Sequence, residues 1–316
     1  MTAGSRALRI GEGDRGRRLD LFLAEKLQLS RAQARRLLAR GAVRIDGRRV
    51  GERAKGTPVA CGATVEVAPF ERAEHQRAVA EPGAPLRVLA DGPGWVALDK
   101  PAGTPVHPLA EEETGTLLNA LIARRPELHG VGEGGLRSGV VHRLDVDTSG
   151  ALLFATEEET WQRLRRAFAE HRVEKIYRAV VLGRPEREGR VELGLVTARH
   201  RPARVRVVGE GERARGARMG RLGWHCLEML ASASLVEVQL ETGFLHQIRA
   251  TFAHLGHPIA GDRNYGPEAD PTGAPRQMLH AARLSLDEIA AESPDPADFA
   301  DLCARLRAQG AGPDAG

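Results

Sequence analysis

The feature that most constrains the fold of this 316-residue chain is the polar loop 142–150, HRLDVDTSG, which lies between two apolar segments. Residues 139–141, GVV, are typical of a strand end, and residues 151–155, ALLFA, of a short buried strand. Catalytic groups are often mounted on such a loop, because the strands hold it in place. Alternatively, its acidic and hydroxyl residues form only a turn that Gly150 closes. Asp145 is the carboxylate that we expect to carry chemistry.

Other segments accompany this loop in a fixed order along the chain. They are 96–108, with VALDKPAG and VHP; 175–180, with KIYRAV; 240–262, with LETG, HQIR and GHPIAGD; and 279–281, with LHA. Together with the loop they resemble the RluA/RluD-type pseudouridine synthases, which isomerise uridine to pseudouridine in structured RNA. The loop matches the family motif H-R-L-D-x-x-T-S/T-G at all its fixed positions. The resemblance covers roughly residues 86–284, and ordered motifs arise by chance far less often than a single pattern.

The resemblance implies an α+β pseudouridine synthase fold, with a central mixed and largely antiparallel sheet flanked by helices. The reaction breaks the N-glycosidic bond and reattaches uracil through C5, so we expect no metal and no cofactor. Asp145 would act as the nucleophile or as the base that drives glycal formation, two routes that remain open. Either role requires an ionised carboxylate, which an arginine in contact favours and orients. The resemblance assigns that arginine to Arg249; alternatively, Arg249 is a surface residue of its helix.

Four more residues of the site follow from the resemblance. Tyr177 is expected to stack on the flipped uracil and to assist loss of the C5 proton, although a strand tyrosine is more often packing material. Arg143 is expected to hold the displaced nucleotide, and Ile248 and Leu279 to contact the substrate.

The segment 240–262 departs from the family pattern, which usually reads G-R-T-H-Q-I-R. Residues 243–245 read GFL and therefore lack a cation and a hydroxyl, which we expect to alter substrate contacts more than the chemistry. His246, His254 and His257 have no H-E-x-x-H pattern beside them, so we expect structural roles for them and no metal site. The three cysteines stand far apart and predict neither disulfides nor zinc.

Residues 17–67 read as a small α/β unit. Apolar residues at helical spacing begin at Leu19, and Ser30 with Gln33 forms a capping box for a second helix. Residues 43–50 predict a hairpin around an Asp-Gly turn, followed by a strand over 63–67. This arrangement resembles the RNA-binding domain first described in ribosomal protein S4. The expected RNA-binding residues on the basic side of the second helix are Arg31, Arg35, Arg36 and Arg40.

The segment 11–16 satisfies G-x-G-x-x-G, but it is not followed by a full βαβ crossover. We therefore interpret it as a turn that leads into the first helix.

Positive charge is concentrated in two segments, although the net charge is only +4. Residues 31–55 hold nine Arg or Lys and two acidic residues, and residues 199–221 hold eight Arg and two acidic residues. Concentrated basic segments are typical of sites for a polyanion. Alternatively, they are solvated faces, and the excess of Arg over Lys reflects base composition.

The domain organisation follows from these patterns. We expect an S4-type RNA-binding domain over 1–69, with its core at about 17–67, a linker over 70–85, the catalytic domain over 86–308 and a disordered tail over 309–316. In the catalytic domain, Thr156 with Glu159 predicts a helix cap, 176–182 a strand, 183–194 a loop-rich stretch and 297–306 a helix.

The leading hypothesis is an RNA pseudouridine synthase, with large-subunit ribosomal RNA as the expected partner and transfer RNA as the alternative. A non-catalytic ribosome-assembly or RNA-chaperone protein is the competing hypothesis, but it would not need to keep Asp145, Tyr177 and Arg249. Glycoside hydrolysis would require two facing carboxylates, and Asp147 has no matched partner motif. We expect a monomer. No apolar run approaches the roughly 20 residues that span a bilayer, so we expect a cytoplasmic protein without membrane contact.

Overall fold

The computed structural model describes residues 5–70, 72, 74–200 and 202–310, and their contacts divide into two units. The main division falls between Arg77 and Ala78, inside the segment 70–85 that the sequence predicts as a linker, and residues 134–136 are grouped with the smaller unit. Ala78 is almost fully buried, so the second half of that segment belongs to the larger unit. Within the described part of the chain, no helix is both long enough and apolar enough to cross a bilayer.

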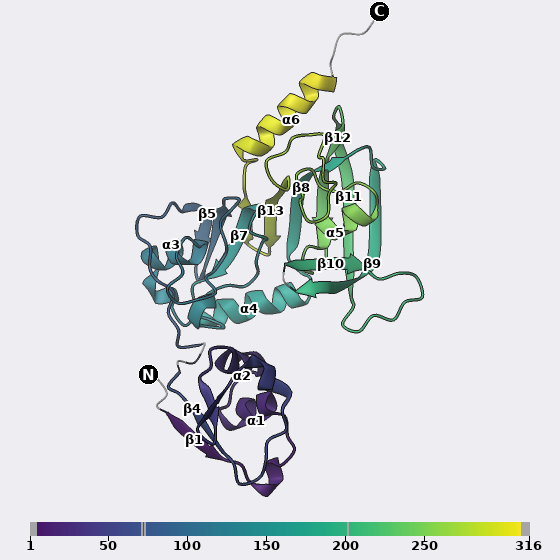
Figure 1. Cartoon of the computed structure of the whole chain (residues 1–316). Coiled ribbons are helices and arrows are strands. Elements are labelled where there is room, and N and C mark those ends of the chain that lie inside the picture. Colours follow the sequence, from purple (N-terminus) through teal and green to yellow (C-terminus); the bar gives the residue numbers. More distant parts are fainter. Residues whose placement is uncertain (1–4, 71, 73, 201, 311–316) are drawn as a thin grey trace, which may run out of the picture. The chain divides into compact units, whose positions relative to one another are not determined.

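The smaller unit packs two helices against a four-stranded sheet with the order β1-β4-β2-β3 (Figure 1). Its elements are β1 (Arg6–Arg9), η1 (Glu12–Asp14), α1 (Leu19–Lys26), α2 (Arg31–Ala39), β2 (Val43–Ile45), β3 (Arg48–Val50), η2 (Glu52–Gly56) and β4 (Thr64–Val67). The apolar side chains at helical spacing are buried, among them Leu19, Phe22 and Leu38. The α/β unit predicted for 17–67 is therefore confirmed, and the G-x-G-x-x-G segment contains only the short turn η1.

Local signals fix the element boundaries in this unit. Ser30 Oγ accepts a hydrogen bond from the Gln33 amide at 3.2 Å, and Gln33 Oε1 accepts one from the Ser30 amide at 2.6 Å. This is the predicted capping box at the start of α2. Asp46 and Gly47 have φ values of 46° and 76°, the backbone of a two-residue hairpin turn.

The larger unit is built on a ten-stranded sheet with the order β10-β9-β11-β12-β8-β13-β7-β6-β5, and β14 pairs with β13. Its strands are β5 (Arg87–Gly92), β6 (Trp95–Lys100), β7 (Ser149–Ala155), β8 (Glu174–Leu182), β9 (Glu188–His200), β10 (Ala203–Val207), β11 (Arg218–Met229), β12 (Ala233–Leu240), β13 (Leu279–Leu286) and β14 (Ile289–Glu292). Neighbouring strands are antiparallel except β13 with β7, which are parallel. The predicted mixed and largely antiparallel sheet is confirmed.

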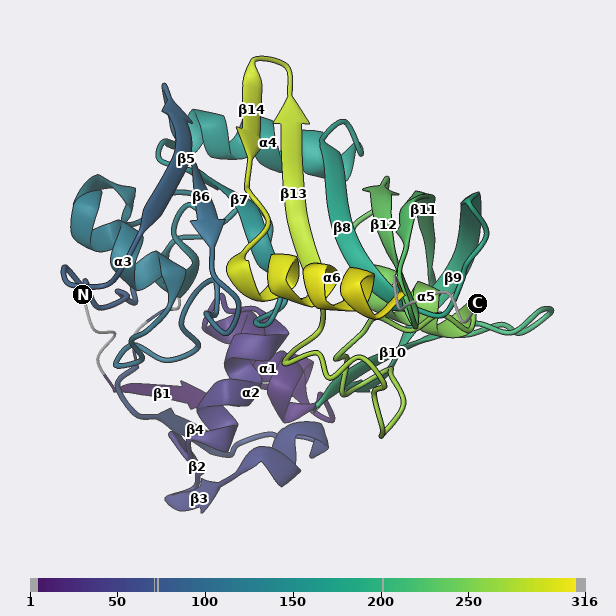
Figure 2. The same cartoon turned by 90° about the horizontal axis from the view of Figure 1, so that it is seen from above.

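Helices cover both faces of this sheet. They are α3 (Leu117–Arg124), α4 (Glu158–Ala169), α5 (Gln247–His254) and α6 (Ala297–Gly310), with the 3₁₀ turns η3 (Pro126–Leu128) and η4 (Gly135–Arg137). The two views place α4 and α6 on opposite faces (Figures 1 and 2). Leu164 of α4 packs with Leu153 of β7, whereas Phe299 of α6 packs into the core around β8 and β12.

Four local predictions in this unit are wrong or incomplete. Helix α4 begins later than the Thr156 capping box implies: its N-cap is Glu157, which makes no side-chain cap hydrogen bond. The stretch 183–194 is not mainly loop, because strand β9 starts at Glu188 and pairs with β11. Residues 139–141 contribute a single bridge, Val140 with Phe154. The expected tail over 309–316 is helical at 309–310, and the rest lies outside the described residues.

Candidate active site

The loop 142–150 runs directly into β7, at the point where β7 pairs in parallel with β13. Gly150 has a φ of 118°, and a Cβ atom there would lie 2.2 Å from the carbonyl oxygen of Ala281 on β13. A side chain would therefore force the two strands apart at the end of the loop. The glycine that closes the motif is required by this close approach.

The hydroxyls of the loop attach it to β13 and to the segment that precedes this strand. Gln277 Nε2 donates to Thr148 Oγ1 at 2.8 Å, and Ser149 Oγ lies 3.0 Å from His280 Nδ1. Arg276 donates to the Asp147 carbonyl oxygen at 3.0 Å. The loop also contains a turn over residues 145–148, in which the Thr148 amide donates to the Asp145 carbonyl at 3.1 Å. The threonine and serine of the motif thus hold the loop in position.

Lys100 fixes the loop from the other side. Its side chain is fully buried, and Nζ donates to the carbonyl oxygens of Val146 and Thr104 at 2.7 Å and of Pro101 at 2.9 Å. Burial lowers the pKa of Lys100 to about 7, while Asp147 and Asp145 act in the opposite direction. Three carbonyl acceptors match the three donors of an ammonium group. The Lys-Pro turn therefore anchors the residue that follows Asp145.

Arg249 connects Asp145 to a second carboxylate. Its Nη1 donates to Asp145 Oδ2 at 2.8 Å, and its Nε and Nη2 donate to Asp262 Oδ2 and Oδ1 at 2.6 and 2.8 Å. The Arg249 side chain is 9% exposed and that of Asp262 is fully buried, so Arg249 is not a surface residue of α5. Burial lowers the pKa of Arg249, but the ion pairs with Asp262 and Asp145 outweigh burial and raise it. Asp145 Oδ1 has no side-chain partner among the described residues.

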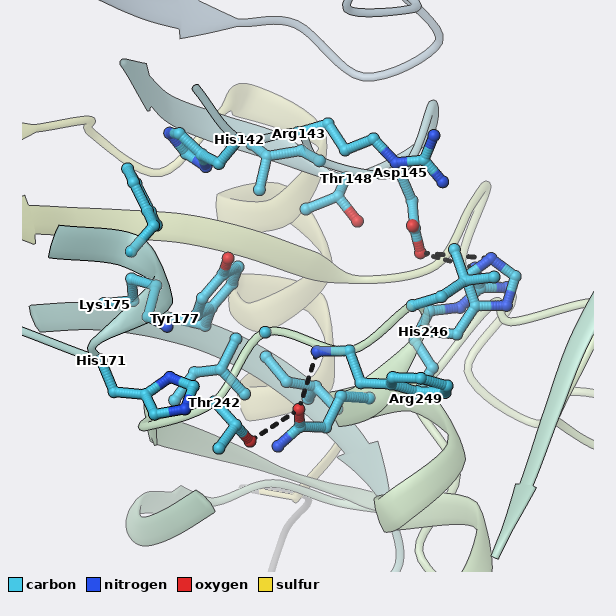
Figure 3. A pocket seen from close by; sticks show the side chains of 18 of the residues that line it. His142, Arg143, Asp145, Thr148, His171, Lys175, Tyr177, Thr242, His246 and Arg249 are labelled. Carbon is cyan, nitrogen blue, oxygen red and sulfur yellow. Dashed lines mark hydrogen bonds and ion pairs between the residues drawn. The ribbon is translucent and has the colours of Figure 1, made fainter. Parts of the chain in front are cut away.

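Asp145 faces a cavity of about 740 Å³ that also contains Tyr177, Ile248, Leu279 and Arg143. In Figure 3, Asp145 and Arg249 lie at one end of the pocket and Lys175 at the other, with Tyr177 between them in this view. The residues that the resemblance assigned to the catalytic site are therefore brought together around one cavity. Their roles in the reaction remain predictions.

Burial shifts the pKa values of two groups in the pocket. Burial, with the nearby Asp145 charge, raises the pKa of Tyr177, so its phenol keeps its proton at neutral pH. Burial lowers the pKa of Lys175 to about 8, and its Nζ donates to the Glu241 carbonyl at 3.3 Å. His142 is structural: its Nε2 accepts the Leu153 amide at 3.0 Å.

Two groups that contact the pocket residues are not predicted by the motifs. Asp262, in the GHPIAGD segment, fixes Arg249 with two hydrogen bonds. His246 was expected to be structural, yet its Nε2 lies 3.8 Å from Asp145 Oδ2. Among the described residues, no group of His, Cys, Asp or Glu side chains could hold a metal ion. The sequence signal for Asp262 and His246 is that both lie in the segment 240–262, which also contains Arg249.

Residues 244 and 245, where the chain departs from the family pattern, line the same cavity. Both pack against an apolar cluster that contains Leu195 of β9 and Val205 of β10. Their side chains therefore contribute to the cavity wall and join it to the β9–β10 hairpin.

The four arginines predicted to bind RNA lie in the smaller unit and differ in their contacts. Arg31 and Arg35 each donate through Nε to Asp20 Oδ2 at 3.0 Å. Arg36 and Arg40 are exposed, and their guanidinium groups have no partner among the described residues.

Comparisons with known proteins identify the family. The family described as RNA pseudouridylate synthase matches residues 94–254, and the S4 domain matches residues 17–54. A protein of Chloroflexus aurantiacus, named an uncharacterized RNA pseudouridine synthase, is 40% identical over 279 residues, which are 85% of this chain and 81% of that protein. The chain belongs to the RNA pseudouridylate synthase family. It is an isomerase that converts uridine to pseudouridine in RNA, and it carries an N-terminal S4 domain.

More distant relatives of this synthase are consistent with the assignment. The ribosomal large subunit pseudouridine synthase D of Nitrosomonas europaea is 35% identical over 306 residues, 92% of the synthase and 85% of the relative. The solved structure of human RNA pseudouridylate synthase domain containing 1 covers 69% of the synthase and 87% of that chain, with a TM-score of 0.56 and 25% identity. The solved structure of human RNA pseudouridylate synthase domain containing 4 covers 70% of the synthase and 93% of that chain, with a TM-score of 0.58 and 24% identity. This likeness supports the fold.

Proposed function

We propose that Asp145 is the catalytic carboxylate of this synthase. The observation that carries the proposal is the contact of Asp145 Oδ2 with buried Arg249 at 2.8 Å, at the wall of a cavity large enough for a nucleotide. The buried cation favours the ionised carboxylate and fixes its orientation. Oδ1 is then the oxygen that reaches the sugar, as nucleophile at C1′ or as the base that removes a sugar proton.

We propose that Tyr177, Ile248 and Leu279 retain the uracil after the glycosidic bond breaks. All three side chains are buried and line the cavity beside Asp145. A planar ring and two aliphatic side chains favour stacking of a freed base over its escape to water. Because Tyr177 keeps its proton, its hydroxyl can donate a hydrogen bond but cannot act as a ready-made base at neutral pH.

We propose that cationic groups around this pocket hold the displaced nucleotide and its neighbours. Arg143 is exposed at the cavity, and Arg218 at the start of β11 lines it as well. A uridine must leave its stack before Asp145 can reach its sugar, which costs a few kcal/mol that phosphate contacts and stacking offset.

The S4 unit, which we propose to be a separate RNA-binding domain, presents a second basic surface. Asp20 is fully buried and holds Arg31 and Arg35 through their Nε atoms, and their side chains remain 48% and 37% exposed. The outward edges of these guanidinium groups are thus fixed in position for phosphate contacts. Arg36 and Arg40 are exposed at the C-terminal half of α2, on a different side of the helix from Arg31 and Arg35.

We propose large-subunit ribosomal RNA as the substrate, because relatives that align with most of the chain carry that name. A ribosomal substrate would place the enzyme in the cytoplasm. Pseudouridine mapping of total RNA from a deletion strain tests this proposal. Loss of one or a few positions in large-subunit RNA is expected, whereas loss confined to transfer RNA would contradict it.

A further inference from the structure

Three polar groups link strand β10 to the catalytic carboxylate. The Val205 amide of β10 donates to the Tyr265 hydroxyl at 2.7 Å, and this hydroxyl lies 3.0 Å from His246 Nδ1. On the opposite side of the imidazole ring, Nε2 lies 3.8 Å from Asp145 Oδ2. Figure 3 shows His246 beside Asp145 and Arg249 at the same end of the pocket.

The direction of these contacts determines where the His246 proton lies. A backbone amide can only donate, so the Tyr265 oxygen accepts from Val205. Among the described residues, His246 Nδ1 is the acceptor within hydrogen-bond distance of the phenolic hydrogen, so the Tyr265 hydroxyl can donate to it. A neutral imidazole that accepts at Nδ1 carries its proton on Nε2. Nε2–H is the group that faces Asp145.

The surroundings of His246 keep the ring neutral. Burial lowers the pKa of His246, and the cations Arg249 and Arg143 act in the same direction, while Asp145 and Asp262 oppose them. Tyr265 also faces the ring, edge to face at a centroid distance of 5.7 Å, and burial raises the pKa of its phenol.

The backbone of His246 supports a role in placing the ring. His246 is the N-cap of α5 and has a φ of 51°. This value lies in the left-handed region, which residues other than glycine rarely adopt. Strain of this kind persists where the surroundings impose it, and it is concentrated at functional sites.

We propose that His246 and Tyr265 are positioning residues for Asp145. Tyr265 selects the Nε2–H tautomer of His246, whose donor closes to hydrogen-bond distance of Oδ2 when the uridine is bound. Catalytic hydrogen bonds are often long in unliganded enzymes and tighten in the substrate complex. With Arg249 and His246 both on Oδ2, Oδ1 is left to face the sugar. This inference rests on the proposed function, in which Asp145 is the catalytic carboxylate.

The same tyrosine connects the carboxylate to the β9–β10 hairpin. Arg204 of β10 and Arg249 both lie over its ring, at 5.7 and 5.2 Å from the centroid. Asn264 Nδ2 donates to the Ala203 carbonyl of β10 at 3.0 Å. The hairpin is thus bonded to residues 262–265, the segment whose Asp262 pairs with Arg249. Tyr265 connects the hairpin to Asp145 through His246.

The tautomer can be measured on the unmodified enzyme by nitrogen-15 NMR of labelled histidine, with the His246 signal identified by its loss in His246→Asn. The expected spectrum shows Nε2–H for His246, and Tyr265→Phe is expected to shift it toward a mixture of tautomers. An Nδ1–H tautomer in the wild type would overturn the proposal. This readout does not depend on turnover, so it is separate from the proposed role of Asp145.

Kinetics test the positioning role. Tyr265→Phe keeps the ring over Arg249 but removes the hydroxyl, and we expect kcat to fall about tenfold with little change in KM. His246→Asn should lower kcat similarly, and the double variant should lose less than the product of the two effects, because both act through one contact. His254→Asn, at an exposed histidine of the same helix, is the matched control and should leave kcat unchanged. Independent, multiplicative effects or an unchanged kcat would contradict the proposal.

If Asp145→Asn retained full turnover, the proposed function would fail whatever the tautomer. If Asp145→Asn is inactive while Tyr265→Phe and His246→Asn keep wild-type kcat, the proposed function stands and the positioning role is wrong.

Discussion

The two units of this chain each contain a cluster of arginine and aspartate, but the buried partner is different in each. In the catalytic unit a nearly buried arginine, Arg249, is shared by Asp145 and Asp262, and Asp145 is the partner that faces the pocket. In the S4 unit a fully buried carboxylate, Asp20, is shared by Arg18, Arg31 and Arg35, and the arginines are the exposed partners.

The comparison shows that ion pairs between arginine and aspartate can orient either an anion or a set of cations. A buried arginine with two carboxylates fixes one carboxylate toward a sugar, where the proposed chemistry needs an anion. A buried aspartate with several arginines fixes cations toward solvent, where a phosphate backbone would bind. In both cases the buried group orients the exposed one at a small entropic cost, because fewer rotamers remain to be lost on binding.

The largest effect is expected at the exposed carboxylate of the catalytic cluster. Asp145→Asn should lower release of tritium from RNA labelled at uridine C5 by at least about 10⁴-fold, because an amide is neither a nucleophile nor a base here. RNA affinity should stay within a few-fold of the wild type. Asp147→Asn, an exposed carboxylate in the same loop, is the matched control and should remain active. Equal activity of the two variants would remove Asp145 from the chemistry.

The next largest effect is expected at the buried cation. Arg249→Ala should lower turnover by roughly 10²-fold or more, because Asp145 loses both its orientation and its counter-charge. The Asp262 carboxylate would also lose its partner, so a fall in thermal stability is expected beside the loss of turnover.

Arg249→Lys separates orientation from charge. Lysine keeps the charge but cannot bridge both carboxylates, so turnover should fall, although by less than in Arg249→Ala. Thermal unfolding of both variants should be measured, because removal of one partner of a buried ion pair costs about 3–5 kcal/mol. Near-normal turnover in a folded Arg249→Ala enzyme would contradict the comparison.

In the S4 unit, Asp20→Asn should affect RNA binding and stability but not the chemical step. Burial raises the pKa of Asp20, but the hydrogen bonds from Arg18, Arg31 and Arg35 outweigh it and hold the pKa well below its usual range. This stabilisation is present above the unfolded-state pKa of about 3.9 and is lost as the pH falls through the folded-state pKa. The stability difference between wild type and variant should therefore be full at neutral pH and shrink in acid.

The affinity of Asp20→Asn for structured RNA should fall by about tenfold at low salt, with kcat at saturating RNA unchanged. Glu66→Gln, on the exposed side of β4, is the control for a change of one surface charge. A fall in turnover at saturation would mean that the S4 unit also acts on the catalytic step.

The smallest effect is expected from the arginines that Asp20 does not hold. Arg36→Ala combined with Arg40→Ala should weaken RNA binding a few-fold. For each phosphate that is no longer neutralised, the slope of log affinity against log salt should decrease by about 0.7 to 0.9. These positions are the cleaner test, because their removal leaves Asp20 paired. An unchanged salt slope would identify this helix face as a solvated surface.

The sequence by itself determined the local elements and indicated Asp145 as the carboxylate that we propose for the chemistry. The apolar spacing from Leu19, the Ser30 capping box and the Asp-Gly hairpin act over a few residues, so their structure could be predicted. The motif around Asp145 and the ordered segments on either side indicated the family, the mixed sheet and the pocket residues. The Thr156 capping box does not form, because the Thr156 amide donates to the Gly94 carbonyl oxygen and Glu157 is the N-cap of α4. Strand β9 was missed because its pairing with β11 lies beyond any local pattern.

Only the tertiary structure decided which side chains meet. Asp145 and Arg249 are 104 positions apart, and Arg249, Asp262, His246 and Tyr265 reach one another from a helix and the loop that follows it. What packs around a charged group decides whether it is buried and orients its partners or faces outward and is itself oriented. Asp20 illustrates the first case and Asp145 the second. Desolvation and hydrogen-bond direction are properties of three-dimensional surroundings, and for that reason the proton of His246 and the free oxygen of Asp145 could not be read from residue order.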